Sequence, residues 1–395
     1  MSTLKSYFTG VAAKYLSAVD ASPTTSNQHE IGSNKFKAIL GDPGVTKVIF
    51  EATFLYFKPD EDEPESCEDR VTWYDTRLGQ RNRSAEYRLY YRRNPITEFF
   101  REGDFCLIGM QTTGKLLIAI APADSADEYR LRHLFGMEQP VGRWLVDSSI
   151  KESRINLATR QILEAMRLEI VQVAALDIDQ LLAKFNKKFP PTKVFSQYAR
   201  DNLPHSISAI DDPDAALEAW MENEELLFRA LERSIVKEKL VSGFSEVDEF
   251  ISFSLSVQNR RKSRVGHALE NHLSAIFDAN VLRYERGART ENNSRPDFLF
   301  PGSKEYHNPA IASPPLRMLG AKTTCKDRWR QVLAEAARIP EKHLFTLETA
   351  ISENQIREMN IASLVLVSTP TVLATYPVYQ DRKTMSLNDF IKLVK

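Results

Sequence analysis

The sequence predicts two domains, a mostly β domain over residues 1–175 and an α/β domain over residues 213–395. The first prediction rests on short runs rich in Val, Ile, Phe and Tyr that are broken by turn residues, a pattern typical of a sandwich or barrel. The second rests on strand-like and helix-like segments that alternate after residue 295. Such alternation indicates a mixed or largely parallel sheet with helices packed on it. A chain of 395 residues is long enough for two such domains.

The first domain is expected to contain several strands and a closing helix. Residues 155–172 have the apolar spacing of an amphipathic helix. Residues 185–214 contain the turn-forming runs FPPTK and DDPD, and residues 176–212 are predicted to link the domains and enter the second. The strands are predicted at 47–57, 70–77, 86–92, 104–111 and 115–122.

The second domain is expected to open with three helices. Asp212 before Pro213 is a typical helix start, because Asp caps the first amides and Pro fits the first turn. This helix should stop at Gly243. A second helix from about Ser245 carries Val247, Phe250, Ile251 and Leu255 on one face, and a third should run from Arg264 to Phe277. Strands are then predicted at 295–300, 316–322, 343–347 and 362–368, and helices at 327–339 and 352–360.

Composition and charge favour an ordinary cytoplasmic protein. No apolar run reaches the roughly 18 residues that span a membrane, and the first residues lack a signal-peptide core. The three cysteines are far apart and form no CxxC pair, which argues against structural zinc and disulfides. Net charge is −1, so any DNA binding must come from local basic runs, which occur at 81–93, 258–264 and 322–330.

One pair of residues fits phosphodiester hydrolysis. Asp297 opens a predicted strand and Lys322 closes the next, so a magnesium ligand and a lysine that orients water or neutralises phosphate could share one edge of a sheet. The alternative is that Asp297 is only a turn acid. The usual nuclease pattern has an acid two residues before the lysine, where this chain has Gly320. An acid must then come from elsewhere. Glu270 lies on the predicted helix before the Asp297 strand and Glu335 on the one after Lys322. The alternative for each is an ordinary solvated helix residue.

The stretches GFSEVDEFI, SVQNRRKSRVGHALENHL, PDFLFP and LRMLGAKTTCKDRWRQVLAEA resemble the catalytic core of the EcoRII restriction endonuclease family, over about residues 185–380. The resemblance implies a PD-(D/E)XK-type fold with a central mixed sheet flanked by helices, and a requirement for Mg²⁺. It also implies that Asp297, Glu335 and Glu270 are metal ligands and that Tyr306 supports the site. The implied catalytic set is Glu270, Asp297, Lys322 and Glu335.

Two basic segments of this domain are expected to contact DNA. By the same resemblance, Lys326, Asp327 and Arg328 read the two outer C·G pairs from the major groove. This fits their chemistry, because Lys and Arg donate to guanine and Asp accepts from cytosine; the alternative is a charged helix start without base contacts. The second segment is interpreted as a phosphate-binding or dimer-facing helix start. Its charged residues are Arg260, Arg261, Lys262 and Arg264.

The first domain resembles the EcoRII effector domain, a B3-like DNA-binding β-barrel, less closely. The resemblance lies in residues 27–32 and 81–88, which form opposite arms of a DNA clamp in that family. Asn34 replaces a family tyrosine, which leaves open whether the domain reads the same sequence. The alternative for His29 is an ordinary loop histidine, and the alternative for residues 81–88 is a charged β-hairpin. The residues expected to contact effector DNA are His29, Arg81, Arg83, Glu86 and Arg88.

The sequence therefore predicts a homodimeric type II, IIE-like restriction endonuclease that cuts double-stranded DNA. The resemblance implies the site CC(A/T)GG, cut on the 5′ side of the first cytosine, a second DNA copy bound as effector, and a cognate methyltransferase as genetic companion. Two alternatives stay open. One is a DNA-binding regulator with an inactive nuclease body, and the other is a repair or recombination nuclease that recognises DNA shape.

Overall fold

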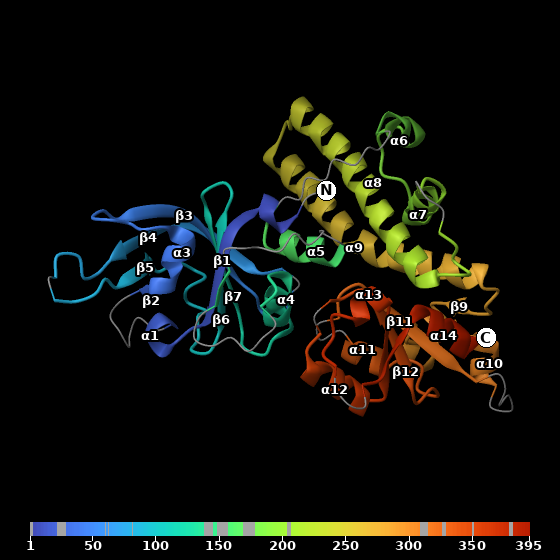
Figure 1. Ribbon diagram of the computed structural model, residues 1–395. Helices are drawn as coiled ribbons and strands as arrows, with labels where there is room; N and C mark the ends of the chain where they lie inside the picture. Colours follow the sequence, from blue (N-terminus) through green and yellow to red (C-terminus); the bar gives the residue numbers. More distant parts are fainter. Residues whose placement is uncertain are drawn as a thin grey trace. The chain divides into compact units, whose positions relative to one another are not determined.

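The structure of the protein is a computed structural model that divides into two compact units, Met1–Val171 and Gln172–Lys395 (Figure 1). None of the helices in the described ranges is long and apolar enough to cross a membrane. The described residues are 3–21, 29–59, 61, 63–80, 82–137, 145–147, 157–168, 178–203, 207–308, 315–325, 329–349, 351–378 and 382–395.

The first unit is built on one curled sheet of eight strands, in the order β2-β5-β4-β3-β7-β6-β1-β8 (Figure 1). Neighbouring strands are antiparallel except β3 and β7, which are parallel. The elements are η1 (Leu4–Ser6), β1 (Phe8–Tyr15), α1 (Ala18–Ala21), β2 (Glu30–Gly32), η2 (Asn34–Phe36), α3 (Lys37–Leu40), β3 (Val48–Tyr56), β4 (Glu65–Asp75), β5 (Tyr87–Tyr91), β6 (Phe105–Gln111), β7 (Leu116–Ala121), α4 (Ala126–Leu134), β8 (Leu145–Asp147) and α5 (Leu157–Ala165).

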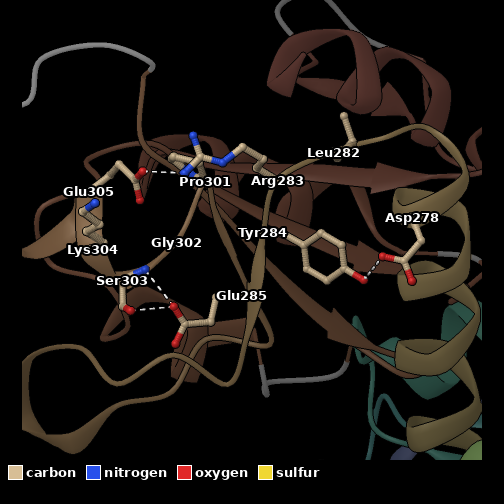
Figure 2. A pocket seen from close by; sticks show the side chains of 10 residues that line it. All are labelled: Asp278, Leu282, Arg283, Tyr284, Glu285, Pro301, Gly302, Ser303, Lys304 and Glu305. Atoms are coloured by element: carbon tan, nitrogen blue, oxygen red, sulfur yellow. Dashed lines mark hydrogen bonds and ion pairs between the residues drawn. The ribbon is translucent and has the colours of Figure 1, made fainter.

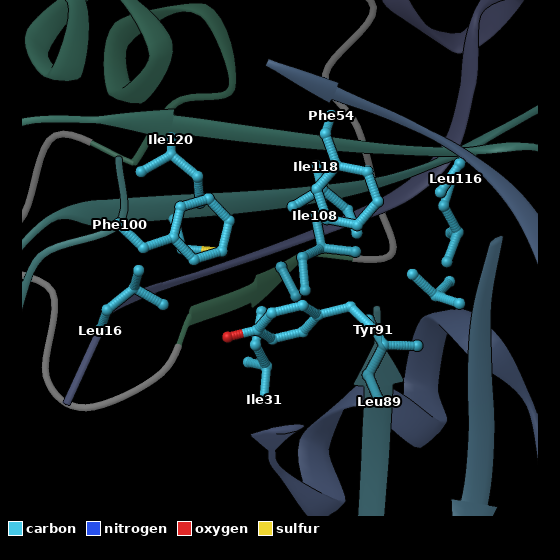
Figure 3. Close-up of a cluster of buried hydrophobic side chains, with 14 of the residues drawn as sticks. Leu16, Ile31, Phe54, Leu89, Tyr91, Phe100, Ile108, Leu116, Ile118 and Ile120 are labelled. Carbon is cyan, nitrogen blue, oxygen red and sulfur yellow. The ribbon is translucent and has the colours of Figure 1, made fainter. Parts of the chain in front are cut away.

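Apolar side chains cover both faces of this sheet. Along β7, Leu116, Ile118 and Ile120 alternate with Leu117 and Ala119, and all five are fully buried. Successive side chains of a strand point to opposite faces. The first three therefore belong to the cluster drawn in Figure 3, and the other two to a cluster that includes side chains of α4 and α5. Burial on both faces calls for nearly continuous apolar runs, which is why these strands can be recognised in the sequence.

The five predicted strands are present as β3 to β7, and the structure adds three more. One of these, β1, is rich in small residues with weak strand propensity. It forms because it pairs with β6 and β8, which buries Val11, Ala12 and Ala13 completely. The helix predicted at 155–172 is shorter than expected, because the chain turns left-handed at Arg167, with φ 59°, soon after α5 ends.

The second unit contains a mixed sheet in the order β14-β13-β12-β11-β10-β9. β9, β10 and β11 are antiparallel, and β11 to β14 are parallel. The predicted mixed sheet with helices is thus present. The elements are α6 (Ile178–Phe185), α7 (Thr192–Asp201), α8 (Pro213–Ser242), α9 (Val247–Ala279), β9 (Glu285–Arg286), η3 (Glu291–Asn293), β10 (Phe298–Phe300), α10 (Ser303–His307), β11 (Arg317–Lys322), α11 (Trp329–Leu333), β12 (Lys342–Thr346), α12 (Glu353–Ile361), β13 (Leu364–Ser368), α13 (Pro370–Leu373), β14 (Thr384–Ser386) and α14 (Leu387–Val394).

Helix α8 begins and ends as its sequence predicts. The Asp212 carboxylate accepts the Ala215 amide at 3.0 Å, Pro213 occupies the first turn, and Gly243 follows the last residue with φ 78°. The preceding stretch, predicted to link the domains and enter the second, contains α6 and α7. The ring of Phe195 on α7 lies 6.2 Å from that of Phe228 on α8, so α7 packs onto the second unit.

Two further predictions about helices are wrong. The sequence predicts two helices between Ser245 and Phe277, whereas α9 is a single helix whose charged middle is met by acids of α8. Its first turns leave the predicted apolar face exposed to solvent, with Val247 73% and Leu255 52% exposed. The helix predicted at 327–339 shortens to α11, because the chain leaves helical geometry and turns left-handed at Ala336.

Candidate active site

Strand register brings Asp297 and Lys322 together. Asp297 directly precedes β10 and Lys322 ends β11, and Phe298 faces Leu319 in this antiparallel pair. Lys322 Nζ donates to Asp297 Oδ2 at 3.0 Å, and the Ala321 amide donates to the same oxygen at 2.7 Å. The two side chains remain 27% and 19% exposed, so a ligand can reach them.

Glu335, just beyond α11, is electrostatically coupled to this pair. Burial, and then the charge of Asp297, raises the pKa of Glu335 to about 7, while Lys322 and Lys342 act to lower it. Its Oε2 atom is buried and has no hydrogen-bond partner among the described residues. Leaving a buried carboxylate oxygen unpaired is costly. A divalent cation shared with Asp297 would remove that cost, so the two acids fit a metal ion.

The surroundings of Gly320 explain why the acid is not on the strand. A Cβ atom at position 320 would lie 3.0 Å from Cγ2 and 3.3 Å from Cγ1 of Val332, on α11. An acidic side chain there would force Val332 to move out of a buried position. Glu335 follows Val332 by three residues and brings a carboxylate to the site from just beyond the end of the same helix.

Glu270, the third predicted metal ligand, has a different partner. Its Oε2 atom accepts a bond from Arg286 of β9 at 2.7 Å. Arg286 faces Phe298, the residue after Asp297, so Glu270 is linked to the site through this arginine. Among the residues that the structure describes, no three His, Cys, Asp or Glu side chains gather closely enough to hold one metal ion. The expected three-acid arrangement is therefore not formed.

Tyr306 supports a neighbouring turn. It is fully buried on α10, its hydroxyl donates to Glu291, and it accepts the backbone amide of Arg338 at 3.2 Å. Because Arg338 lies three residues after Glu335, Tyr306 contacts the turn that carries the acid.

Similarity to known proteins decides the family. A family model described as EcoRII C terminal matches residues 228–391. The chain is also 30% identical over 403 residues to the type II restriction enzyme EcoRII of Escherichia coli. This match covers 98% of this chain and 94% of that protein. The chain belongs to the EcoRII family. The predicted resemblance is therefore confirmed.

Solved structures of other restriction endonucleases are more distant from this EcoRII-family chain. Metal-depleted Ecl18kI in complex with uncleaved DNA is 19% identical, with a TM-score of 0.42, covering 55% of this chain and 84% of that one. The PspGI–substrate DNA complex is 15% identical, with a TM-score of 0.41, covering 56% and 97%.

The basic run on α9 of this EcoRII-family protein is exposed at Arg260, Arg261 and Lys262 but buried at Arg264. Arg264 is 4% exposed and is paired with Glu225 of α8. Arg261 is about half exposed and pairs with Glu232 at 2.7 Å. Arg260 is exposed, with its guanidinium 4.3 Å from the centre of the Phe189 ring, and Lys262 is exposed too. Arg264 therefore joins two helices instead of facing solvent.

The residues expected to read bases, Lys326, Asp327 and Arg328, lie outside the described residues. Both of their neighbours are in the core, since Cys325 is 0% and Trp329 3% exposed. The Cys325 amide donates to the buried carboxylate of Glu348 at 3.2 Å. In this EcoRII relative, the residues on either side of the expected base-reading segment are therefore held in the core.

The two segments that resemble the EcoRII effector clamp are neighbours in the first unit. Strand β2 pairs with β5, with Gly32 opposite Arg88, and the Asn34 side chain accepts the Tyr87 amide at 3.0 Å and donates to the Ala85 carbonyl at 3.1 Å. Asn34, which replaces the family tyrosine, therefore joins the segments.

Individual effector residues are placed as follows. The His29 ring packs edge-on against Tyr91 at 5.5 Å, and its Nδ1 atom has no hydrogen-bond partner among the described residues. Glu86 is paired with Arg77 and Arg88, so two of these charges neutralise each other. Arg83 is exposed, and Arg81 lies outside the described residues.

A shallow hollow of about 560 Å³ lies at the other end of β10 (Figure 2). Most of its charged side chains are occupied by local contacts: Arg283 pairs with Glu305 at 2.6 Å, Glu285 accepts the Ser303 amide at 2.9 Å, and Asp278 accepts the Tyr284 hydroxyl at 2.7 Å. None of the predicted catalytic residues lines it. The candidate active site is therefore the opposite end of this strand.

Proposed function

We propose that this protein is a magnesium-dependent type II restriction endonuclease that hydrolyses double-stranded DNA at a short specific site. Membership of the EcoRII family supports this reaction. The observation that carries the proposal is the group of Asp297, Lys322 and Glu335 where β10 begins and β11 ends. It combines two acids that fit a cation with a lysine that fits a phosphate.

Asp297 and Glu335 would hold the magnesium ion. Mg²⁺ prefers carboxylate oxygens and usually keeps several waters, so two protein ligands suffice. Oε2 of Glu335 is buried and unpartnered among the described residues, and both bonds to Asp297 go to Oδ2, so Oδ1 takes part in neither. When bound, the ion supplies positive charge that stabilises the charged phosphate during its hydrolysis.

Lys322 brings a second positive charge to the scissile phosphate. Its ammonium is held 3.0 Å from Asp297 Oδ2 at the end of a buried strand. From there it can donate to a phosphate oxygen or hold the attacking water in line. The register of β10 and β11 fixes it relative to Asp297, and this preorganised geometry lowers the barrier.

The specific site is proposed to be CC(A/T)GG, cut on the 5′ side of the first cytosine. Lys326, Asp327 and Arg328 would read the outer C·G pairs only a few residues after the catalytic lysine. Because a nearly two-fold symmetric site calls for a two-fold symmetric protein, we propose a homodimer in which each subunit cuts one strand. A methyltransferase that protects the same site is expected as genetic companion.

The first unit is proposed to be a B3-like effector domain that binds a second copy of the site. Its curled sheet and its division from the catalytic unit after Val171 are compatible with this role. His29, Arg81, Arg83, Glu86 and Arg88 are proposed to contact that DNA, with the exposed Arg83 best placed to do so.

The decisive experiment digests a plasmid with the purified protein and Mg²⁺ and sequences the ends. We expect cuts at one sequence, and none with the Lys322→Ala variant prepared in parallel. Intact plasmid under all Mg²⁺ conditions would refute the nuclease. For the effector role, an oligonucleotide duplex carrying the site should stimulate cutting of a one-site plasmid. Equal stimulation of wild type and an Arg83→Ala variant would remove Arg83 from that role.

A further inference from the structure

The backbone that carries Glu335 adopts an unfavourable conformation. α11 ends at Leu333, and Ala336, directly after the acid, has φ 47°. This left-handed region costs a residue other than glycine about 1 kcal/mol or more and persists only when its surroundings impose it. Since Oε2 of Glu335 has no bond of its own among the described residues, the carboxylate lies where this turn places it.

Side chains from the loop before β10 and from α10 accept the backbone amides of the turn. Three successive backbone N–H groups each donate to such a side chain: Ala336 to Thr290 Oγ1 at 3.4 Å, Ala337 to Glu291 Oε2 at 3.2 Å, and Arg338 to the Tyr306 hydroxyl at 3.2 Å. The central acceptor is Glu291, which also receives the Tyr306 hydroxyl. Burial acts to raise the pKa of Glu291, but these bonds outweigh it and the pKa is lowered, so the acceptor stays charged.

A buried lysine holds the carbonyls of the same turn. Lys342, the first residue of β12, is 7% exposed, and its Nζ donates to the Ile339 carbonyl at 2.8 Å and the Ala336 carbonyl at 3.5 Å. Burial lowers the pKa of Lys342, and the charges of Glu335 and Glu291 oppose that effect. The turn is therefore fixed through its amides on one side and its carbonyls on the other.

We propose that Glu291 and Lys342 are positioning residues that hold the turn after α11 so that the Glu335 carboxylate faces Asp297. The proposal rests on the proposed metal-dependent nuclease and adds residues that nothing in the catalytic pattern indicates. Neither residue is required to touch DNA or the metal, because both act through the backbone. Loss of partners that orient a metal ligand typically lowers metal affinity about 10- to 100-fold.

The test compares Glu291→Ala, Glu291→Gln and Lys342→Met with wild type. The first readout is Mn²⁺ affinity without DNA, by titration calorimetry, with Glu335→Gln identifying binding at this site. The second is the Mg²⁺ concentration that gives half-maximal cutting. We expect Glu291→Ala and Lys342→Met to weaken Mn²⁺ binding about 10- to 100-fold and to raise that Mg²⁺ concentration. Glu291→Gln should restore much of the affinity, because its amide oxygen still accepts the Ala337 amide.

Glu285→Ala is the matched control. Glu285 also ties a backbone amide with its carboxylate, that of Ser303 at 2.9 Å, at the other end of β10. It should leave Mn²⁺ affinity unchanged. Equal losses in this control, or unchanged affinity in both folded test variants, overturn the proposal. If Glu291→Ala does not fold, Tyr306→Phe removes one acceptor of the same turn and keeps the ring.

The two proposals fail differently. If wild type binds Mn²⁺ through Glu335 and the variants weaken it, but DNA is never cut, the nuclease proposal fails and the positioning role stands. If wild type cuts DNA and the folded variants bind Mn²⁺ as it does, only the positioning role fails. If wild type shows no Mn²⁺ binding that depends on Glu335, the positioning role is overturned directly.

Discussion

Replacing Glu335 by Gln is expected to stabilise the metal-free protein at alkaline pH while abolishing its cutting activity. The carboxyl is half-buried, and burial and the charge of Asp297 raise its pKa from 4.5 to about 7. A charged carboxylate at this position therefore destabilises the folded protein in the absence of a cation. Gln has nearly the same shape and carries no charge, so it removes this cost together with the metal ligand.

The magnitude follows from the pKa of Glu335. Because the folded-state pKa of about 7 lies above the ordinary 4.5, the folded state binds the proton more tightly than the unfolded state. The destabilisation is absent below about pH 4.5 and complete above about pH 7. The shift corresponds to about 3 kcal/mol. Solvent screening of this partly exposed carboxyl reduces the expected gain for Glu335→Gln to about 1–2 kcal/mol at pH 8.

The assay is urea unfolding with EDTA at pH 8 and pH 5, followed by tryptophan fluorescence, to which Trp220 and Trp329 of the second unit contribute. The gain should fall to about a quarter of that value at pH 5. Glu358→Gln, at an exposed pair with Arg330, is the control and should change stability by less than about 1 kcal/mol at either pH. Mg²⁺ should stabilise wild type but not Glu335→Gln. A Gln variant no more stable than wild type at pH 8 would refute the reasoning.

Three further predictions follow from the contacts of the second unit. Lys322→Ala should abolish cutting and leave binding to the specific duplex within a few-fold of wild type in a gel-shift assay with Ca²⁺; cleavage at a rate near wild type would contradict its role. Gly320→Glu should lower the unfolding free energy by about 1–3 kcal/mol because its Cβ meets Val332, and adding Val332→Ala should recover part of the loss; destabilisation that the second change does not relieve would count against this contact. Arg264→Met should cost about 1–3 kcal/mol, because Glu225 loses one buried partner and keeps Arg229. A loss confined to salt-dependent DNA affinity, with unchanged stability, would restore the phosphate-contact interpretation.

Several strands were predictable because they are buried on both faces. Strand β7 and the first four residues of β13 are apolar without interruption, and tertiary packing agrees with their local preference. The proximity of Asp297 and Lys322 was predictable for a related reason. A strand start and the end of the following antiparallel strand necessarily meet, so sequence order already implies the distance.

Contacts between helices were not predictable in the same way. The sequence pattern of α9 alone indicates a solvated charge at Arg264. Its burial depends on Glu225, which lies opposite it on α8. That pairing follows from the register between two long helices, and a single chain position does not reveal it. In hindsight, the signal was the acids Glu225 and Glu232, two turns apart on α8, which pair with Arg264 and Arg261 on α9.

The displaced acid has a structural consequence for the whole site. The sheet would fix the position of a carboxylate on β11, as it fixes that of Lys322. Val332, however, fills the space beside Gly320. Glu335 instead depends on a left-handed turn that follows a five-residue helix. The precision that a strand would have supplied must then come from side chains that tie the turn down, and these belong to the loop before β10, to α10 and to β12. Residues that control metal binding should therefore extend well beyond the catalytic group, into segments where the catalytic pattern itself gives no reason to look.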